Sequence, residues 1–321
     1  MKSYFIYQGP HYVHADWARS VGCKFIHFRF HKQLVRSKLS KVIMRTHLLW
    51  FRKPTFVIAE GGAPLIEAAL LKVTKETPII YLASDITPYR ILEGRDELLK
   101  ELIEFSNLTV AISKMVLEDT SRLCLLREHD VVYPFVREKF FDYKERARKD
   151  EKKAVFVGNL LKHKGADLLP EVTETIRRKM KDFKLMVIGK PIEVGLKESY
   201  GLKSLGSVPL NILMREVSSS KVYIHPARYE PFGVSVAEAV VLGTLPVVSN
   251  KTGIKELLPG DLVANSLNEL VEKTIYILGL DRGEYEELLI KTKKRLEPKI
   301  KREKSIKLFK TLIEDFLSDT N

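Results

Sequence analysis

The sequence predicts an α/β protein built from two doubly wound domains, each around a parallel sheet. Short apolar runs alternate with helical patterns along the chain, as expected for parallel strands that are buried on both faces. A polar, strongly charged stretch at 137–153 interrupts this alternation. The 321 residues also provide about two domains of roughly 150 residues each.

The first half contains six runs that we interpret as strands, each separated from the next by a helical pattern. They lie at 4–7, 24–28, 55–59, 78–82, 108–112 and 130–133. Strand-helix-strand alternation of this kind is typical of a Rossmann-like domain. We place this domain at residues 1–145, with the linker near residue 145.

The second half repeats the pattern and then becomes helical to its end. Strands are expected at 154–157, 185–188, 221–224, 245–248 and 261–264, followed by helical patterns that include 284–296 and 301–316. We place a second Rossmann-like domain at 146–321. Since ligands bind at the carboxyl ends of strands in such sheets, we expect the two domains to face a central cleft.

The chain carries 54 Lys and Arg against 41 Asp and Glu, a formal charge of +13 that favours anionic partners. Most of the excess lies in residues 1–53 and 291–310. Within the first segment, residues 32–53 form a basic amphipathic pattern that predicts a helix. We favour a surface helix that packs its apolar stripe on the sheet; the alternative is direct contact with an anionic membrane.

Two cysteines, Cys23 and Cys124, belong to no CxxC pair or Cys/His cluster, so the sequence predicts neither a disulfide scaffold nor a zinc site. There is no secretory leader pattern and no run of 18 apolar residues. We therefore expect a cytoplasmic protein, with peripheral attachment at the inner membrane face as an option. Scarce Gln beside abundant Lys, Arg and Glu is also typical of a heat-adapted protein.

Residues 229–256, YEPFGVSVAEAVVLGTLPVVSNKTGIKE, form the most informative stretch. A loop that contains Gly233 leads into a helix that starts near Val234 and ends at Gly243. Free N–H groups and the positive end of the helix dipole meet there, which predicts a phosphate site. Glu230 on the loop and Glu238 on the helix can both face the same ligand.

The spacing of Glu230 and Glu238 resembles the E-x7-E signature of retaining glycosyltransferases of the GT-B fold, the large family-4 type also called glycosyl transferases group 1. Five further segments occur in the order that this family shows: FVGNL at 156–160, KG at 164–165, MVIG at 186–189, LGSV at 205–208 and YIHP at 223–226. The resemblance covers residues 151 to about 280 well and the first half only loosely. It also implies that the terminal helices, at about 297–321, cross back to the first domain.

The resemblance implies that the second domain binds a nucleotide-diphosphate sugar. Glu230 would then bind hydroxyls of the donor sugar, and Lys164 would neutralise charge on the departing diphosphate. The backbone around Gly233 would cradle the pyrophosphate, Glu238 would take the ribose hydroxyls, and Val208 would meet the base. The full implied donor-binding set is Gly158, Asn159, Val208, Phe232, Gly233, Val234, Ser235 and Glu238.

One residue departs from the family pattern. Asn159 stands where the family usually has Arg, so a second phosphate-binding cation is either absent or supplied by another residue, for which Arg228 is a candidate. The chain has no Asp-x-Asp pair to clamp a diphosphate through a divalent metal. We therefore expect no metal and no cofactor other than the nucleotide sugar, and the resemblance implies transfer with retention and without a separate base.

The acceptor is expected in the first domain, on loops that follow strands at 8–11, 60–64 and 84–87. Asp85 stands where many family members have a His, which makes it a catalytic candidate; His11 and His14 are alternative substitutes. The sequence does not identify the acceptor, which could be a glycan, a lipid-linked molecule or a small molecule.

The competing hypothesis is a non-catalytic basic protein that binds an anionic membrane surface or nucleic acid. The charge of +13 favours it. No basic motif with interleaved aromatic residues supports nucleic-acid binding, so we expect no nucleic-acid partner.

Overall fold

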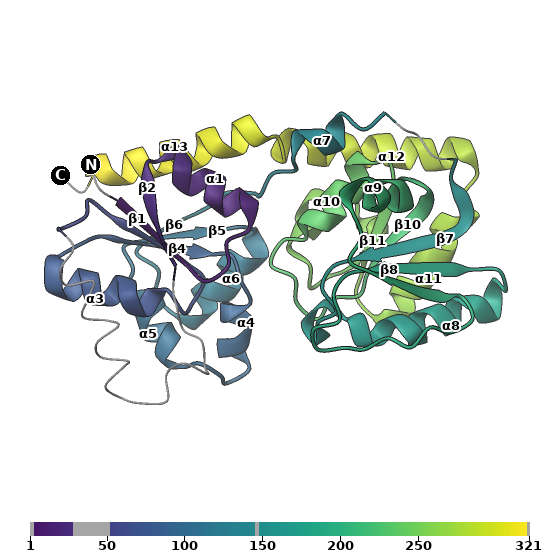
Figure 1. Ribbon diagram of the computed structural model, residues 1–321, viewed down its shortest axis with the longest axis horizontal. Coiled ribbons are helices and arrows are strands. Elements are labelled where there is room, and N and C mark those ends of the chain that lie inside the picture. Colours follow the sequence, from purple (N-terminus) through teal and green to yellow (C-terminus); the bar gives the residue numbers. More distant parts are fainter. Residues whose placement is uncertain (1–2, 28–51, 145–147, 320–321) are drawn as a thin grey trace. The chain divides into compact units, whose positions relative to one another are not determined.

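The computed structural model describes residues 3–27, 52–144 and 148–319 (Figure 1). The chain divides into two compact units, one of residues 1–134 and 303–321 and the other of residues 135–302. The predicted boundary near residue 145 therefore lies inside the second unit. The charged stretch expected as a linker contributes helix α7 (Glu138–Phe141), whose Phe140 is buried.

The first unit contains a six-stranded sheet in the order β2-β1-β3-β4-β5-β6, and every neighbouring pair is parallel. Its strands are β1 (Ser3–Tyr7), β2 (Cys23–His27), β3 (Val57–Glu60), β4 (Ile79–Ala83), β5 (Leu108–Ala111) and β6 (Glu128–Val131). Its helices are α1 (Tyr12–Ser20), α3 (Leu65–Lys75), α4 (Thr87–Leu92), α5 (Leu98–Glu104), α6 (Lys114–Leu123) and α13 (Arg302–Asp319).

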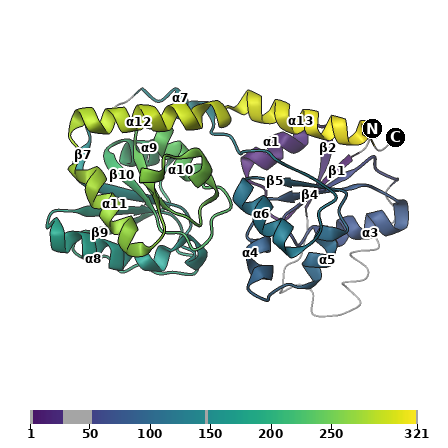
Figure 2. The same ribbon diagram turned by 180° about the vertical axis from the view of Figure 1, so that it is seen from behind.

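The C-terminal helix α13 belongs to the first unit although it comes last in the chain. The Trp17 ring on α1 stacks on Phe309 of α13 with ring centroids 5.1 Å apart, and its Nε1 donates a hydrogen bond to Ser305 at 3.0 Å. In both ribbon views α1 and α13 lie on one side of this sheet, while α3, α4 and α5 lie on the other (Figure 2). Helix α13 therefore completes one face of the core.

The second unit contains a six-stranded parallel sheet in the order β12-β11-β10-β7-β8-β9. Its strands are β7 (Asp150–Val157), β8 (Lys184–Ile188), β9 (Leu202–Gly206), β10 (Ser220–His225), β11 (Leu245–Ser249) and β12 (Val263–Ala264). Its longer helices are α8 (Leu169–Lys179), α9 (Leu210–Ser218), α10 (Val234–Val241), α11 (Leu267–Gly279) and α12 (Arg282–Leu296). In each view α9, α10 and α12 cover one side, and α8 and α11 the other.

These two sheets confirm the predicted fold class, GT-B with two Rossmann-like parallel-sheet units. Every run that we interpreted as a strand overlaps a strand of the structure, which adds one more, β9. The predicted terminal helices at 284–296 and 301–316 correspond to α12 and α13.

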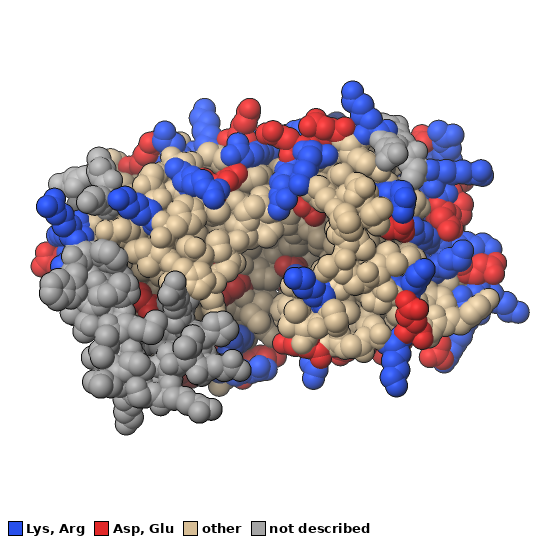
Figure 3. All heavy atoms as spheres, in the orientation of Figure 1, with Lys and Arg blue, Asp and Glu red and all other residues tan. Residues whose placement is uncertain are grey.

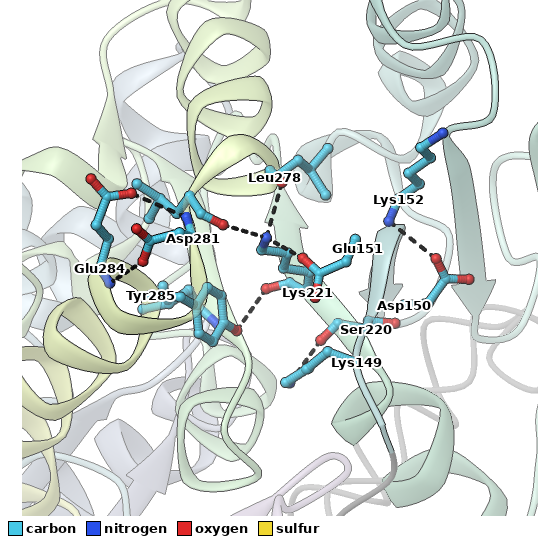
Figure 4. Close-up of polar contacts among 12 residues, drawn as sticks. Lys149, Asp150, Glu151, Lys152, Ser220, Lys221, Leu278, Asp281, Glu284 and Tyr285 are labelled. Atoms are coloured by element: carbon cyan, nitrogen blue, oxygen red, sulfur yellow. Dashed lines mark hydrogen bonds and ion pairs between the residues drawn. The ribbon is translucent and has the colours of Figure 1, made fainter.

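A buried lysine fixes the start of β10 in the second unit (Figure 4). Lys221 pairs with Glu151 and donates hydrogen bonds to the carbonyls of Leu278 at 3.0 Å and Leu280 at 2.7 Å. The hydroxyl of Tyr285 donates to the Lys221 carbonyl at 2.8 Å. These contacts tie α11 and α12 to the amino end of the strand, so the opposite, carboxyl end is held in a fixed place.

The described surface mixes both signs of charge. On the face shown in Figure 3, Lys and Arg are interspersed with Asp and Glu. Among the residues outside the four uncertain stretches, no helix combines the length and apolar character needed to cross a membrane. The predicted basic helix at 32–53 lies almost entirely outside the described residues.

Candidate functional site

The carboxyl ends of β7 and β10 lie side by side at the centre of the second sheet. Strand order reverses at this point, because β8 and β9 continue on one side of β7 while β11 and β12 continue beyond β10. The connections that leave the two strands therefore diverge, and such a reversal point is where open α/β sheets bind ligands. The predicted donor residues in the loops after these two strands surround this position.

A tight turn after β7 packs on the loop after β10. The turn is the short 3-10 helix η2 (Lys162–Lys164), and Gly165 closes it at a φ of 72°. A side chain at Gly165 would place its Cβ 2.0 Å from the carbonyl oxygen of Pro226. The backbone N–H groups of Arg228 and Tyr229 donate to the His163 carbonyl at 2.8 and 3.0 Å. Glycine is therefore required for this close approach of the two loops.

Arg228 strengthens the same junction. Its guanidinium group makes two hydrogen bonds to the Asp167 carboxylate, at 2.7 and 2.9 Å, and a third to the Lys162 carbonyl at 2.7 Å. This bidentate geometry holds the guanidinium against Asp167. Arg228 therefore has a structural partner in Asp167, and its role as a second phosphate-binding cation stays a prediction.

Lys164 and Glu230 meet where the two loops join. The Lys164 Nζ lies 2.9 Å from the Glu230 Oε2, and the same oxygen lies 3.5 Å from Nε2 of His225, the last residue of β10. Burial acts to raise the pKa of Glu230, but Lys164 and His225 together outweigh it and hold the pKa well below its ordinary value. Glu230 is therefore a carboxylate at neutral pH, available as a hydrogen-bond acceptor.

Helix α10 begins directly after this pair. Gly233 precedes it with a φ of 99°, and its carbonyl accepts the first helical hydrogen bonds, from Val236 and Ala237. The N–H groups of Val234 and Ser235, which precede these two, have no intrahelical acceptor, so they present donors at the positive end of the helix dipole. Phe232 is buried and its carbonyl accepts from the Ile254 N–H at 2.8 Å, which holds the loop in place.

The Ser235 hydroxyl is already engaged. It lies 2.8 Å from the Tyr223 hydroxyl, which in turn donates to the Val157 carbonyl at 2.8 Å. Because the Tyr223 proton is used for Val157, Ser235 is the donor to Tyr223. Burial raises the pKa of Tyr223 above its ordinary value, so the phenol stays protonated. Ser235 thus ties α10 to β7 and β10, and keeps its backbone N–H and its oxygen lone pairs for a ligand.

The remaining predicted donor residues follow β7 and β9 or lie on α10. Gly158 directly follows β7, with the Lys164 side chain 3.6 Å from where its Cβ would be, and Asn159 is exposed next to it. Glu238 is half-buried on the second turn of α10. Val208 follows β9, at the end of another strand of the same sheet.

Two histidines of this site had no role in the sequence analysis. His225 is fully buried and stacks on Phe156, with ring centroids 5.7 Å apart. His163 lies on the η2 turn, and burial lowers its pKa below its ordinary value. His225 lies in the YIHP segment quoted above, but its contact with Glu230 depends on a loop geometry that the sequence does not show.

Asp85, the third predicted catalytic residue, lies in the first unit. Its carboxylate accepts hydrogen bonds from the N–H groups of Thr87 at 2.9 Å and Gly62 at 3.3 Å, and so joins the loops that follow β3 and β4. These loops line a cavity of about 700 Å³ within this unit, together with residues that include Gln8, His11, His14 and Glu60. All three loops expected to hold the acceptor therefore contribute to one cavity.

Within the described ranges, no three His, Cys, Asp or Glu side chains are grouped so that they could hold a metal ion. Both described cysteines, Cys23 and Cys124, are free thiols. Burial raises the pKa of Cys23 to about 12.

Residues 137–295 match the family model of the glycosyl transferases group 1. The GPI3 subunit of the phosphatidylinositol N-acetylglucosaminyltransferase of Saccharomyces cerevisiae is 27% identical over 152 residues, which are 44% of this chain and 34% of the relative. An uncharacterized glycosyltransferase of Methanocaldococcus jannaschii is 30% identical over 119 residues, 34% of this chain and 30% of the relative. The match thus spans about a third of each of these curated relatives.

Solved structures resemble the chain over nearly its whole length. Anabaena HepE, in complex with UDP and glucose, has a TM-score of 0.74 at 14% identity, covering 99% of this chain and 100% of that one. Sucrose-phosphate synthase from Thermosynechococcus elongatus has a TM-score of 0.77 at 13% identity, with the same coverage. At such identities the likeness concerns the fold.

Proposed function

We propose that the chain, which belongs through residues 137–295 to the glycosyl transferases group 1, transfers a sugar from a nucleotide-diphosphate sugar to an acceptor hydroxyl. The observation that carries the proposal is the 2.9 Å pair of Lys164 and Glu230 next to the amino end of α10, at the point where strand order reverses. A cation, a carboxylate and free N–H groups at one place match a sugar attached to a diphosphate.

In this proposal Lys164 binds the diphosphate and Glu230 binds the sugar. An ammonium group has three N–H donors, so Lys164 can keep its bond to Glu230 and offer the others to phosphate oxygens. The first N–H groups of α10, from Val234 and Ser235, face the same anion. Glu230, held as a carboxylate, accepts hydrogen bonds from sugar hydroxyls, and Glu238 accepts from the ribose.

The reaction proposed is transfer with retention. The bond between the anomeric carbon and the diphosphate oxygen breaks, and the acceptor oxygen bonds to that carbon on the same face. The acceptor proton passes to the departing phosphate oxygen, so no separate base is needed. Lys164 and the α10 amino end stabilise the charge that builds on the diphosphate, which is the largest single effect in many such sites.

We further propose that transfer needs no divalent metal and that the acceptor binds in the cavity of the first unit. Two observations support metal independence: the sequence has no Asp-x-Asp pair, and the positive groups just described can take the place of a metal at the diphosphate. Rates measured in EDTA and in magnesium test it: equal rates support the proposal, and complete loss of transfer in EDTA contradicts it.

The donor site is tested first by thermal unfolding with UDP, GDP, ADP and dTDP and their sugars. A ligand at 100 times its Kd stabilises the folded state by about 2.7 kcal/mol, which is readily measured. We expect one base to give a selective shift that Lys164→Met abolishes and that Lys181→Met, at an exposed site after α8, leaves unchanged. No shift with any nucleotide, together with salt-sensitive binding to anionic vesicles, would favour the non-catalytic alternative.

Retention is tested on the product. Proton NMR of the newly formed glycoside reports its anomeric configuration. This configuration cannot change by mutarotation, because the anomeric carbon is held in the glycosidic linkage. A product with the configuration of the donor supports the proposal, and the opposite configuration refutes it.

A further inference from the structure

The cavity of the first unit lies at the reversal point of its own sheet. Strand β1 has β2 on one side and β3 on the other, so the connections that leave β1 and β3 diverge. Gln8 and Gly9 follow β1, and Glu60 is the last residue of β3. All three line the cavity. The position is therefore a ligand-binding crevice of the same kind as the one in the second unit.

A histidine and a glutamate pair inside this cavity. Nδ1 of His14, on α1, lies 2.5 Å from Oε1 of Glu60, and the two side chains are only 7% and 9% exposed. Their neighbours fix them: the His14 ring lies 5.5 Å from the ring of Trp17, which is stacked on α13. The pair joins two residues that are 46 apart in sequence, and both side chains are almost entirely buried.

The pair leaves one ring nitrogen for a ligand. With Nδ1 of His14 engaged by Glu60, Nε2 is the ring nitrogen that remains for a ligand. Among the described residues no partner of Nε2 is recorded, and His14 lines the cavity. This is the arrangement in which a carboxylate orients an imidazole toward a hydroxyl group.

Carboxylates outnumber Lys and Arg in the part of the lining that the structure describes. Glu60, Asp85 and Asp96 contribute carboxylates to it. Within the described part of the lining, Arg90 is the one Lys or Arg, and it is neutralised by Asp96 at 2.7 Å. A phosphate or carboxylate on the ligand would thus meet more negative than positive charge. Hydroxyl groups fit instead, because carboxylates, the Ser84 and Thr87 hydroxyls and imidazole all accept from them.

We propose that this cavity binds an uncharged, polyhydroxylated acceptor, a sugar or a cyclitol, and that Nε2 of His14 accepts a hydrogen bond from the acceptor hydroxyl while Glu60 fixes the ring. The role of His14 in transfer rests on the proposed function, whereas binding of the acceptor in the cavity does not require the donor. His14 contacts the acceptor, and Glu60 is a positioning residue that acts through His14.

The test is saturation-transfer NMR on the full-length protein without nucleotide, with methyl α-D-glucopyranoside and myo-inositol as probes. Glucose 6-phosphate and inositol 1-phosphate are their charged counterparts. We expect at least one neutral probe to bind, and its phosphorylated form to bind at least tenfold more weakly. We also expect His14→Gln and Glu60→Gln to weaken binding about tenfold, and His129→Gln, at an exposed site on β6, to leave it unchanged.

The outcomes separate this inference from the proposed function. Absence of binding by both neutral probes, tighter binding of the phosphorylated forms, or unchanged binding in both cavity variants would overturn it. The comparison of neutral and charged probes uses the parent protein, so it stands even when a variant fails to fold. Neutral-probe binding in a protein that no nucleotide stabilises would instead support the cavity assignment and refute the proposed function.

Discussion

Removing Lys164 should destabilise the protein mainly by leaving Glu230 as an unpaired buried carboxylate. At the observed 2.9 Å, two unit charges attract by about 6 kcal/mol at an effective dielectric constant of about 20, and by about 3 kcal/mol at 40. Lys164 is 24% exposed and Glu230 12%, so solvent screening favours the lower figure. After desolvation, we expect a coupling of about 2 kcal/mol between the two side chains.

A double-mutant cycle of Lys164→Met and Glu230→Gln measures this coupling. Urea unfolding at pH 7.5, followed by circular dichroism, gives the free energy of unfolding of all four proteins. We expect Lys164→Met to cost about 2 kcal/mol more in the parent than in the Glu230→Gln background. Equal costs in both backgrounds would refute the reasoning.

The pH dependence of the same pair has a definite sign. Because the folded-state pKa of Glu230 lies below its ordinary value of 4.5, the stability that this carboxylate contributes is present above pH 4.5 and is lost as pH falls through the folded-state pKa. In Lys164→Met the largest effect that offsets burial is lost and only that of His225 is left, so the pKa of Glu230 rises. The variant should therefore lose stability relative to the parent as pH rises from about 4 to 7, and a pH-independent difference would contradict this assignment.

Three further predictions concern other parts of the fold. Gly165→Ala should lower the free energy of unfolding by at least about 2 kcal/mol and abolish nucleotide stabilisation, because its Cβ would meet the Pro226 carbonyl. Gly195→Ala, with open space around its Cβ, is the control; equal thermal melts would refute the close approach. Burial lowers the pKa of Lys149 from 10.5 to about 7, so the unfolded chain holds more protons there between these values. The stability of the parent relative to Lys149→Met should then rise with pH in this window, by up to about 1.4 kcal/mol per unit in urea titrations, and a falling difference would contradict it. Phe309→Ala should cost about 3–5 kcal/mol in urea unfolding, because the ring is buried between α13 and α1; a cost below about 1 kcal/mol would show that α13 is not part of this core.

The sequence predicts the sheets well, because buried parallel strands are continuous apolar runs. It misses β9, whose residues LKSLG include two polar side chains and are mostly half-buried at the edge of the sheet. It also treats 137–153 as a linker, because abundant charges hide the buried Phe140 and the half-exposed, charged start of β7 at 150–153. Edge strands and short buried helices do not have the apolar pattern on which such predictions depend.

The sequence predicts only part of the candidate site, because some of its residues are close together in the chain and others meet only when two loops pack together. Glu230 and the start of α10 are local in sequence, so the motif is sufficient to propose them. The contacts of Glu230 with Lys164 and His225, and the pairing of Arg228 with Asp167, depend on how two loops pack, which spacing alone does not show. Likewise, His14 and Glu60 become a pair only when β1 and β3 are neighbours.

The most direct test of the central claim is the release of nucleoside diphosphate from the selected nucleotide sugar, measured with acceptor present in the parent, Lys164→Met and Glu230→Gln proteins. The account predicts that both substitutions lower kcat by about 100-fold or more, since each removes a group that meets the reacting donor. The control Lys181→Met should keep the parent rate. Release at near-parent rates by both variants, folded as judged by circular dichroism, would contradict the claim that this site carries out glycosyl transfer.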